Sequence, residues 1–223
     1  MTKKQKAAAV IKLLKEKYPD VKCALTYEKP HELLIAVRLS AQCTDKRVNL
    51  VTPVLFERFA SIDAFANANI ADVEECIKSC GLYHTKAEDI VKMCRMLRDT
   101  YGGNVPDTIE ELVKLPGVGR KTANLIAGDL YGKPAMVCDT HVIRITNRLG
   151  LSSGKDAVQV EKQLRALVPP AEGLMMCHRL VWYGREVCTA RSPQCSSCIL
   201  KKFCRNAPIG APPQTPQGGL CPP

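Results

Sequence analysis

Four cysteines near the C-terminal end are the strongest chemical signal in the sequence. The spacing C-x6-C-x2-C-x5-C, within 17 residues, joins Cys188, Cys195, Cys198 and Cys204. Four soft ligands this close together indicate a metal centre. Two disulfides are the alternative. The sequence argues against them, because Lys12 and Lys15 interrupt the apolar run that a secretory signal needs, which indicates a reducing intracellular compartment.

The spacing alone is compatible with zinc and with an iron–sulfur cluster. A single Cys-x2-Cys, Cys195 to Cys198, is flanked by two unpaired arms. Zinc ribbons usually pair two such knuckles, so the pattern favours iron and sulfur.

A second signal is the glycine-containing segment LPGVGRKTA, residues 115–123. Gly117 and Gly119 permit a tight turn, and the helix expected after them would present backbone N–H groups that attract phosphate. A short connection between two helices without chemical importance is the plain alternative. Arg120 and Lys121 favour the functional interpretation, because cations in a first helical turn oppose the helix dipole.

Lys121 is a candidate nucleophile. A helix N-terminus, a neighbouring arginine and partial burial all favour the neutral amine, which can form a Schiff base. A solvated surface lysine is the alternative. Asp139, 18 residues later, ends a short extended stretch and precedes a predicted helix. It is either a plain N-cap or a carboxylate that accepts the lysine's proton, and one residue can do both.

The elements that must position these groups are helical almost throughout, so we predict an all-α fold. Capping signals place helix starts at Asn69, Thr85 and Thr108, and glycines end helices at 81, 102–103, 132 and 150. Pro53 should kink or split a helix over 45–59. Further helices are expected at 157–167 and 175–187, with one short extended stretch near 135–138.

Composition points to a globular, basic protein. Of 223 residues, 46% are hydrophobic and 24% charged, and 32 basic against 22 acidic residues give a net charge of +10. This charge favours a polyanionic partner, nucleic acid first. No apolar run is long enough to predict a membrane span. Residues 207–223 are rich in proline and glycine and predict a disordered tail.

Taken together, the hairpin, Asp139 and the cysteine spacing resemble the endonuclease III family of DNA glycosylases. Two further stretches, 39–45 (LSAQCTD) and 81–87 (GLYHTKA), also resemble segments of that family. The resemblance spans residues 5–206. It implies two helical lobes: a six-helix barrel over 22–133, with the helix-hairpin-helix at about 108–131, and a [4Fe–4S] lobe made of 1–21 and 134–206.

The resemblance also implies the activity and the site residues. A monomeric enzyme would excise oxidised pyrimidines from duplex DNA and cleave the strand by β-elimination, with Lys121 as nucleophile and Asp139 assisting. The base must first be flipped out of the helix. By family likeness, further residues would contact DNA: Gln42, Leu82, Gly117, Val118, Gly119 and His141. The alternatives are a polar helix end for Gln42, a surface leucine for Leu82 and a structural hydrogen bond for His141.

Two rival functions remain. An adenine-mismatch glycosylase shares the hairpin and the cluster but lacks the nucleophilic lysine. A non-catalytic iron–sulfur protein that binds DNA or carries electrons has no need of Lys121 and Asp139 beside a phosphate-binding hairpin. Replacing Lys121 separates these functions.

Overall fold

The computed structural model describes residues 1–206, so the predicted disordered tail at 207–223 lies outside the described residues. Within residues 1–206 the elements are eleven α-helices and two short 3₁₀ helices, without a strand, which confirms the all-α prediction. The chain divides into two compact units, residues 22–137 and residues 1–21 with those from 138 onward. Residues 134–137, expected in the cluster lobe, therefore belong to the first unit. Nowhere in the described part of the chain is a helix both long and apolar enough to cross a membrane.

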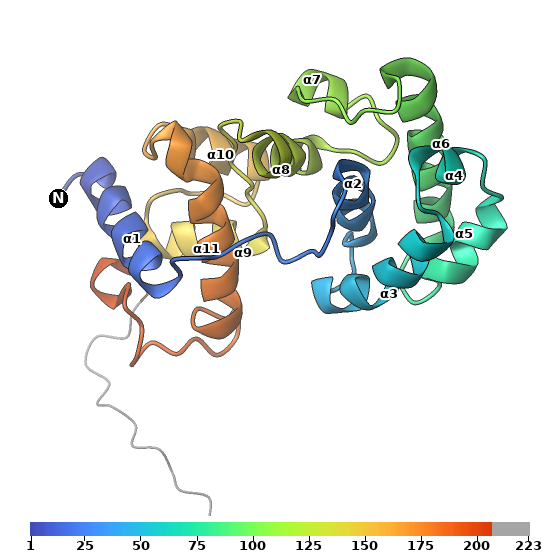
Figure 1. The fold of residues 1–223 in the computed structure, drawn as a ribbon. Coiled ribbons are helices and arrows are strands. Elements are labelled where there is room, and N and C mark those ends of the chain that lie inside the picture. Colours follow the sequence, from blue (N-terminus) through green and yellow to red (C-terminus); the bar gives the residue numbers. More distant parts are fainter. Residues whose placement is uncertain (207–223) are drawn as a thin grey trace, which may run out of the picture. The chain divides into compact units, whose positions relative to one another are not determined.

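The first unit, residues 22–137, is called the hairpin unit below. It contains six helices and the single-turn α7: α2 (Pro30–Leu39), α3 (Asp45–Arg58), α4 (Ile62–Ala66), α5 (Ile70–Ile77), α6 (Tyr83–Tyr101), α7 (Ile109–Leu112) and α8 (Arg120–Tyr131). The long α6 has α4 and α5 packed beside it, and α2 contacts α3, α6 and α8 (Figure 1). Because α2 is surrounded in this way, its side chains Leu33, Leu34 and Ile35 are fully buried on all sides of the helix.

Several predicted helix ends in the hairpin unit are confirmed. The side chain of Asn69 accepts a hydrogen bond from Ala71 N (3.1 Å) at the start of α5. Thr108 accepts one from Glu111 N (3.3 Å) at the start of α7. Gly132 ends α8 with a φ of 63°, a left-handed conformation that glycine adopts without steric cost.

The helix start predicted at Thr85 is wrong. Helix α6 begins at Tyr83, so Thr85 lies inside it and does not cap it. The cause is tertiary: the fully buried Lys86 donates from Nζ to Leu39 O (2.8 Å), which fixes the start of α6 against the end of α2. Helix α3 runs through Pro53 without a split and contacts α2 and α5, so of the kink or split expected there only the split is excluded.

The second unit is called the cluster unit. It contains α1 (Lys3–Lys17), α9 (Thr140–Leu149), α10 (Ala157–Arg165), α11 (Gly173–Glu186) and the 3₁₀ turns Pro170–Glu172 and Lys201–Phe203. Helix α11 packs against both α1 and α9 (Figure 1). The rings of Tyr18 and Tyr183 meet edge to face, with centroids 6.4 Å apart. The two helices predicted at 157–167 and 175–187 are confirmed as α10 and α11.

Candidate active site and metal centre

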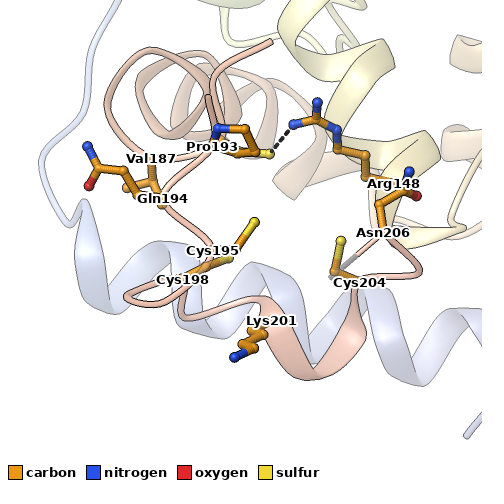
Figure 2. Close-up of a pocket in the computed structure, with 10 residues that line it drawn as sticks. Arg148, Val187, Pro193, Gln194, Cys195, Cys198, Lys201, Cys204 and Asn206 are labelled. Carbon is orange, nitrogen blue, oxygen red and sulfur yellow. Dashed lines mark hydrogen bonds between the residues drawn. The ribbon is translucent and has the colours of Figure 1, made fainter. Parts of the chain in front are cut away.

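The four clustered cysteines line a single cavity of about 210 Å³ in the cluster unit. All four come from the loop that follows α11, and the sulfurs of Cys195 and Cys204 point into the shared space, whereas Lys201 points away from it (Figure 2). In the described part of the chain these four are free thiols, so the two-disulfide alternative is wrong.

Hydrogen-bond donors surround the sulfurs. Arg148 donates from Nη1 to Cys188 Sγ (3.1 Å) and also to Thr189 O (2.9 Å). Tyr183 donates from its hydroxyl to Cys198 Sγ (2.9 Å). Burial raises the pKa of Tyr183 above its ordinary value, and the hydrogen bond to Cys198 adds to the rise, so the phenol keeps its proton. Donors and a cation beside thiolate sulfurs are what an iron–sulfur cluster with four cysteine ligands requires.

Helix α9 joins the cluster loop to Asp139. Asp139 is the N-cap of α9, and its Oδ1 accepts from Val142 N (2.8 Å), so the N-cap interpretation is confirmed. One turn along the helix, Arg144 donates from Nη2 to Cys188 O (2.9 Å). Asp139 and two arginines that bind the cluster loop, Arg144 and Arg148, therefore belong to one rigid element.

His141 lies on the same helix and has a structural contact. Its Nδ1 is 3.1 Å from Arg144 Nη2, and burial lowers the pKa of His141, which favours the neutral ring as the acceptor. A Cβ atom at Gly184 would lie 2.5 Å from this nitrogen, so α11 can approach only because residue 184 is glycine. The structural hydrogen bond expected as the alternative for His141 is present. Its contact with DNA stays a prediction.

The hairpin rests on an ion pair that the sequence did not reveal. Arg38 on α2 and Asp89 on α6 lie 2.7 Å apart, with side chains only 12% and 21% exposed. Gly117 has a φ of +74°, and a Cβ there would lie 2.6 Å from Arg38 Nε and 2.8 Å from Asp89 Oδ2. Glycine is thus required at residue 117 by both its backbone conformation and this close approach.

The residues expected to hold phosphate differ from one another. Gly119 directly precedes α8, whose start has no side-chain cap. The N–H of Val118 already donates to Leu115 O (3.1 Å), and the Val118 side chain is buried. The hydrogen bond inside the hairpin therefore removes the simplest basis for a phosphate contact from Val118. The prediction rests on Gly117, Gly119 and the start of α8.

Lys121 lies in the first turn of α8, as predicted, and that turn contains no acidic residue. Its side chain is exposed, so the partial burial expected from the sequence is not found. The lysine is open to a ligand that approaches the start of the helix.

Gln42 and Leu82 share an unusual backbone conformation. Within residues 1–206 they are the only non-glycine residues with positive φ, 53° and 59°. Both are exposed, and the two segments are neighbours, because a Cβ built on Gly81 lies 3.6 Å from Gln42 O. Such conformations cost roughly 1–3 kcal/mol each and concentrate at functional sites. No sequence signal reveals them, and the same is true of Lys86, which joins α6 to the end of α2 just before Gln42.

Comparison with known proteins points to one family. Residues 35–170 match the model of the HhH-GPD superfamily base excision DNA repair protein, and residues 188–204 match the iron-sulfur binding domain of endonuclease III. Endonuclease III of Bacillus subtilis (strain 168) is 45% identical over 189 residues, which cover 84% of this chain and 86% of the relative.

Two solved structures are similar over nearly the whole chain. A non-covalent Endonuclease III-DNA complex matches with a TM-score of 0.88 and 44% identity, covering 93% of this chain and 97% of that one. A trapped Endonuclease III-DNA covalent intermediate matches with the same TM-score and identity, covering 93% and 98%.

The matched regions contain the features described above. The first contains the hairpin, Lys121 and Asp139, and the second is the loop of four cysteines. The thiols and their donors fit the [4Fe–4S] cluster of the family. The chain therefore belongs to the endonuclease III family of iron–sulfur DNA glycosylases, within the HhH-GPD superfamily of base-excision repair proteins.

Proposed function

We propose that this member of the family excises oxidised pyrimidines from duplex DNA and then cleaves the strand 3′ of the abasic site, with Lys121 as the nucleophile. The observation that carries the proposal is an exposed lysine in the first turn of α8, directly after a glycine hairpin anchored on Arg38 and Asp89. A nucleophile that must reach the sugar of a flipped nucleotide needs such a position beside bound phosphate.

DNA binding has two contributions. The net charge of +10 favours the polyanion at long range, and its effect weakens as salt rises. At short range, the backbone at Gly117 and Gly119 and the start of α8 hold a phosphate next to the lesion. The phosphate also offsets the unfavourable interaction between the helix dipole and the cations Arg120 and Lys121.

Lys121 Nζ attacks C1′ of the flipped nucleotide, and the bond from C1′ to the base breaks as the base leaves. The lone pair of Nζ then opens the sugar ring by breaking the C1′–O4′ bond, and O4′ takes up a proton. The iminium formed in this way acidifies the proton on C2′. Loss of that proton, with departure of the 3′ phosphate, breaks the strand by β-elimination. Hydrolysis of the imine returns Lys121 and completes the reaction.

Asp139 is proposed to accept the proton of Lys121 and to stabilise positive charge on the sugar. The hydrogen bond from Val142 N to Oδ1 keeps this carboxylate in one orientation.

Gln42 and Leu82 are proposed to act on the duplex where the damaged nucleotide leaves the stack. Gln42 fills the gap, and Leu82 wedges against the opposite strand. Their support is the pair of strained backbone conformations, and for Leu82 an apolar side chain that is 55% exposed. An exposed leucine gains free energy when it enters the stack and leaves water.

The cluster has a structural part in this proposal. When bound, the [4Fe–4S] group supplies four metal–sulfur bonds that hold the 188–204 loop in one conformation. Arg144 and Arg148 then join that loop to α9 and to Asp139 at its start. We further propose a monomer that works in the reducing compartment where the DNA lies.

The test uses a duplex with one thymine glycol, in the presence of borohydride. The wild type should form a covalent protein–DNA adduct, and Lys121→Ala should form none while keeping the visible absorbance of its cluster. Asp139→Asn is the matched variant, because asparagine caps a helix as well as aspartate does but is not a base. It should melt like the wild type and form the adduct far more slowly.

Two results would contradict the proposal. One is the absence of an adduct from wild-type protein whose cluster is intact. A mismatch duplex with adenine would then test the adenine-glycosylase alternative. The other is an adduct that persists in Lys121→Ala, which would assign the nucleophile to a different amine.

A further inference from the structure

We propose that Cys43 and Cys80 form a reversible disulfide that locks together the two segments carrying Gln42 and Leu82. Cys43 directly follows Gln42, and Cys80 is separated from Leu82 only by Gly81. Each thiol is thus within two residues of a side chain with strained backbone and a proposed role at the lesion. Neither cysteine belongs to the cluster unit or to the four ligands described above.

The two free thiols lie close enough to influence each other, because Cys43 contributes to the raised pKa of Cys80. The backbone on either side is close as well, since the Cβ position of Gly81 lies 3.6 Å from Gln42 O. Each cysteine ends a backbone turn. The N–H of Cys43 donates a hydrogen bond to Ser40 O (3.1 Å), and the N–H of Cys80 donates one to Ile77 O (2.8 Å). A covalent bond between the sulfurs therefore needs no large movement of either segment.

The thiols differ in how they meet solvent. Cys43 is half-buried and accessible to a small oxidant, whereas Cys80 is fully buried. Burial, with a smaller contribution from Cys43, raises the pKa of Cys80 to about 11, so Cys80 is a protonated thiol at neutral pH. The nearby cations Lys86 and Arg47 lower the pKa of Cys80, but their effect is smaller than that of burial. This asymmetry makes Cys43 the thiol that reacts first and Cys80 the one that resolves.

The oxidant we infer is a peroxide. The thiolate of Cys43 attacks the O–O bond, which gives a sulfenic acid on Cys43 and releases hydroxide. The sulfur of Cys80 then attacks the sulfenic sulfur, the S–S bond forms, and the hydroxyl leaves as water with the proton of Cys80. Two thiols lose two electrons and two protons, and one hydrogen peroxide becomes two waters. A dithiol reductant reverses the reaction by exchange.

The consequence for activity rests on the proposed function. If Gln42 and Leu82 insert where a damaged nucleotide leaves the duplex, their segments must adjust to the bent DNA. Two free thiols permit that adjustment, and a disulfide prevents it. We expect the oxidised protein to bind a lesion-containing duplex about tenfold more weakly than the reduced protein, equivalent to about 1.4 kcal/mol.

The experiment treats the intact, cluster-loaded protein with hydrogen peroxide and then blocks the remaining thiols. Non-reducing peptide mass spectrometry should find the peptides of Cys43 and Cys80 linked, two hydrogen atoms lighter than their sum, and separate after dithiothreitol. The variants Cys43→Ser and Cys43→Ala should not form the link, and each supports the other if one folds poorly. Cys76→Ala is the matched control, because Cys76 is another half-buried thiol of the same unit.

The visible absorbance of the cluster is recorded throughout, so that damage to the cluster is not mistaken for oxidation of the pair. Failure of wild-type protein with an intact cluster to form the linked peptide would overturn the proposal. If the disulfide-linked protein binds the thymine glycol duplex as tightly as the reduced protein, the proposed effect of the disulfide on DNA binding is wrong. The linked peptide is measured without DNA, so failure of the proposed function, seen as no borohydride adduct from reduced protein, is a separate outcome.

Discussion

Replacing Gly117 with alanine measures how much the close approach between the hairpin and the Arg38–Asp89 pair contributes to stability. Two effects oppose the alanine. A left-handed backbone at φ +74° costs an L-residue roughly 1–2 kcal/mol. The new Cβ would also lie 2.6 Å from Arg38 Nε and 2.8 Å from Asp89 Oδ2, so the pair must separate. Disturbing a mostly buried, charge-assisted hydrogen bond costs roughly 1.5–3 kcal/mol.

Gly132→Ala is the matched control. Gly132 also has positive φ, 63°, and belongs to the same unit, but no atom lies within 4 Å of its Cβ position. It therefore has the conformational cost alone. The loss of freedom that alanine imposes on the unfolded chain is the same for both variants and cancels in the comparison. Gly117→Ala should be less stable than Gly132→Ala by about 2 kcal/mol.

The assay is thermal unfolding followed by far-ultraviolet circular dichroism, with all proteins at the same cluster content. A difference of about 2 kcal/mol corresponds to a Tm roughly 4–8 °C lower for Gly117→Ala than for Gly132→Ala. Equal Tm values for the two variants, within about 1 °C, would refute the reasoning. The Arg38–Asp89 ion pair would then accommodate a methyl group at residue 117 without loss of stability, and glycine would be needed there only for its positive φ.

Two further predictions concern single side chains. Arg148→Met removes the donors to Cys188 Sγ and Thr189 O. The visible absorbance of the cluster should therefore decay faster in air than it does in the wild type. An unchanged decay rate would contradict a role for Arg148 in holding the loop. Burial lowers the pKa of His31. Below about pH 6.5 the unfolded chain therefore binds a proton at this histidine that the folded chain does not bind. The free energy of unfolding then falls, as the pH is lowered, by at most about 1.4 kcal/mol per pH unit. His31→Gln should remove that part of the decline in Tm between roughly pH 7 and pH 5, and a variant that declines as steeply as the wild type would contradict it.

Much of the site was predictable because its signals are local in sequence. The four cysteines lie on one loop of 17 residues, so their spacing alone predicts that they share a centre. The caps at Asn69, Thr108 and Asp139 involve groups two or three residues apart and were predicted in the same way. Thr85 shows the limit of this reasoning, because the contact between Lys86 and Leu39 O overrides a local cap signal.

The partners that support the site could not be predicted, because they come from distant parts of the chain. Arg38 and Asp89 under the hairpin are 51 residues apart, and Arg148 and Cys188 are 40 apart. A charge or a thiol in a sequence does not indicate which residue it will meet, since that depends on how helices pack. The sequence by itself determined most of the helices, the cluster loop and the position of Lys121 in the first turn of α8. Only the tertiary structure decided the strain at Gln42 and Leu82 and brought the segment of Cys43 beside that of Cys80, because both depend on α2 and α6 lying together.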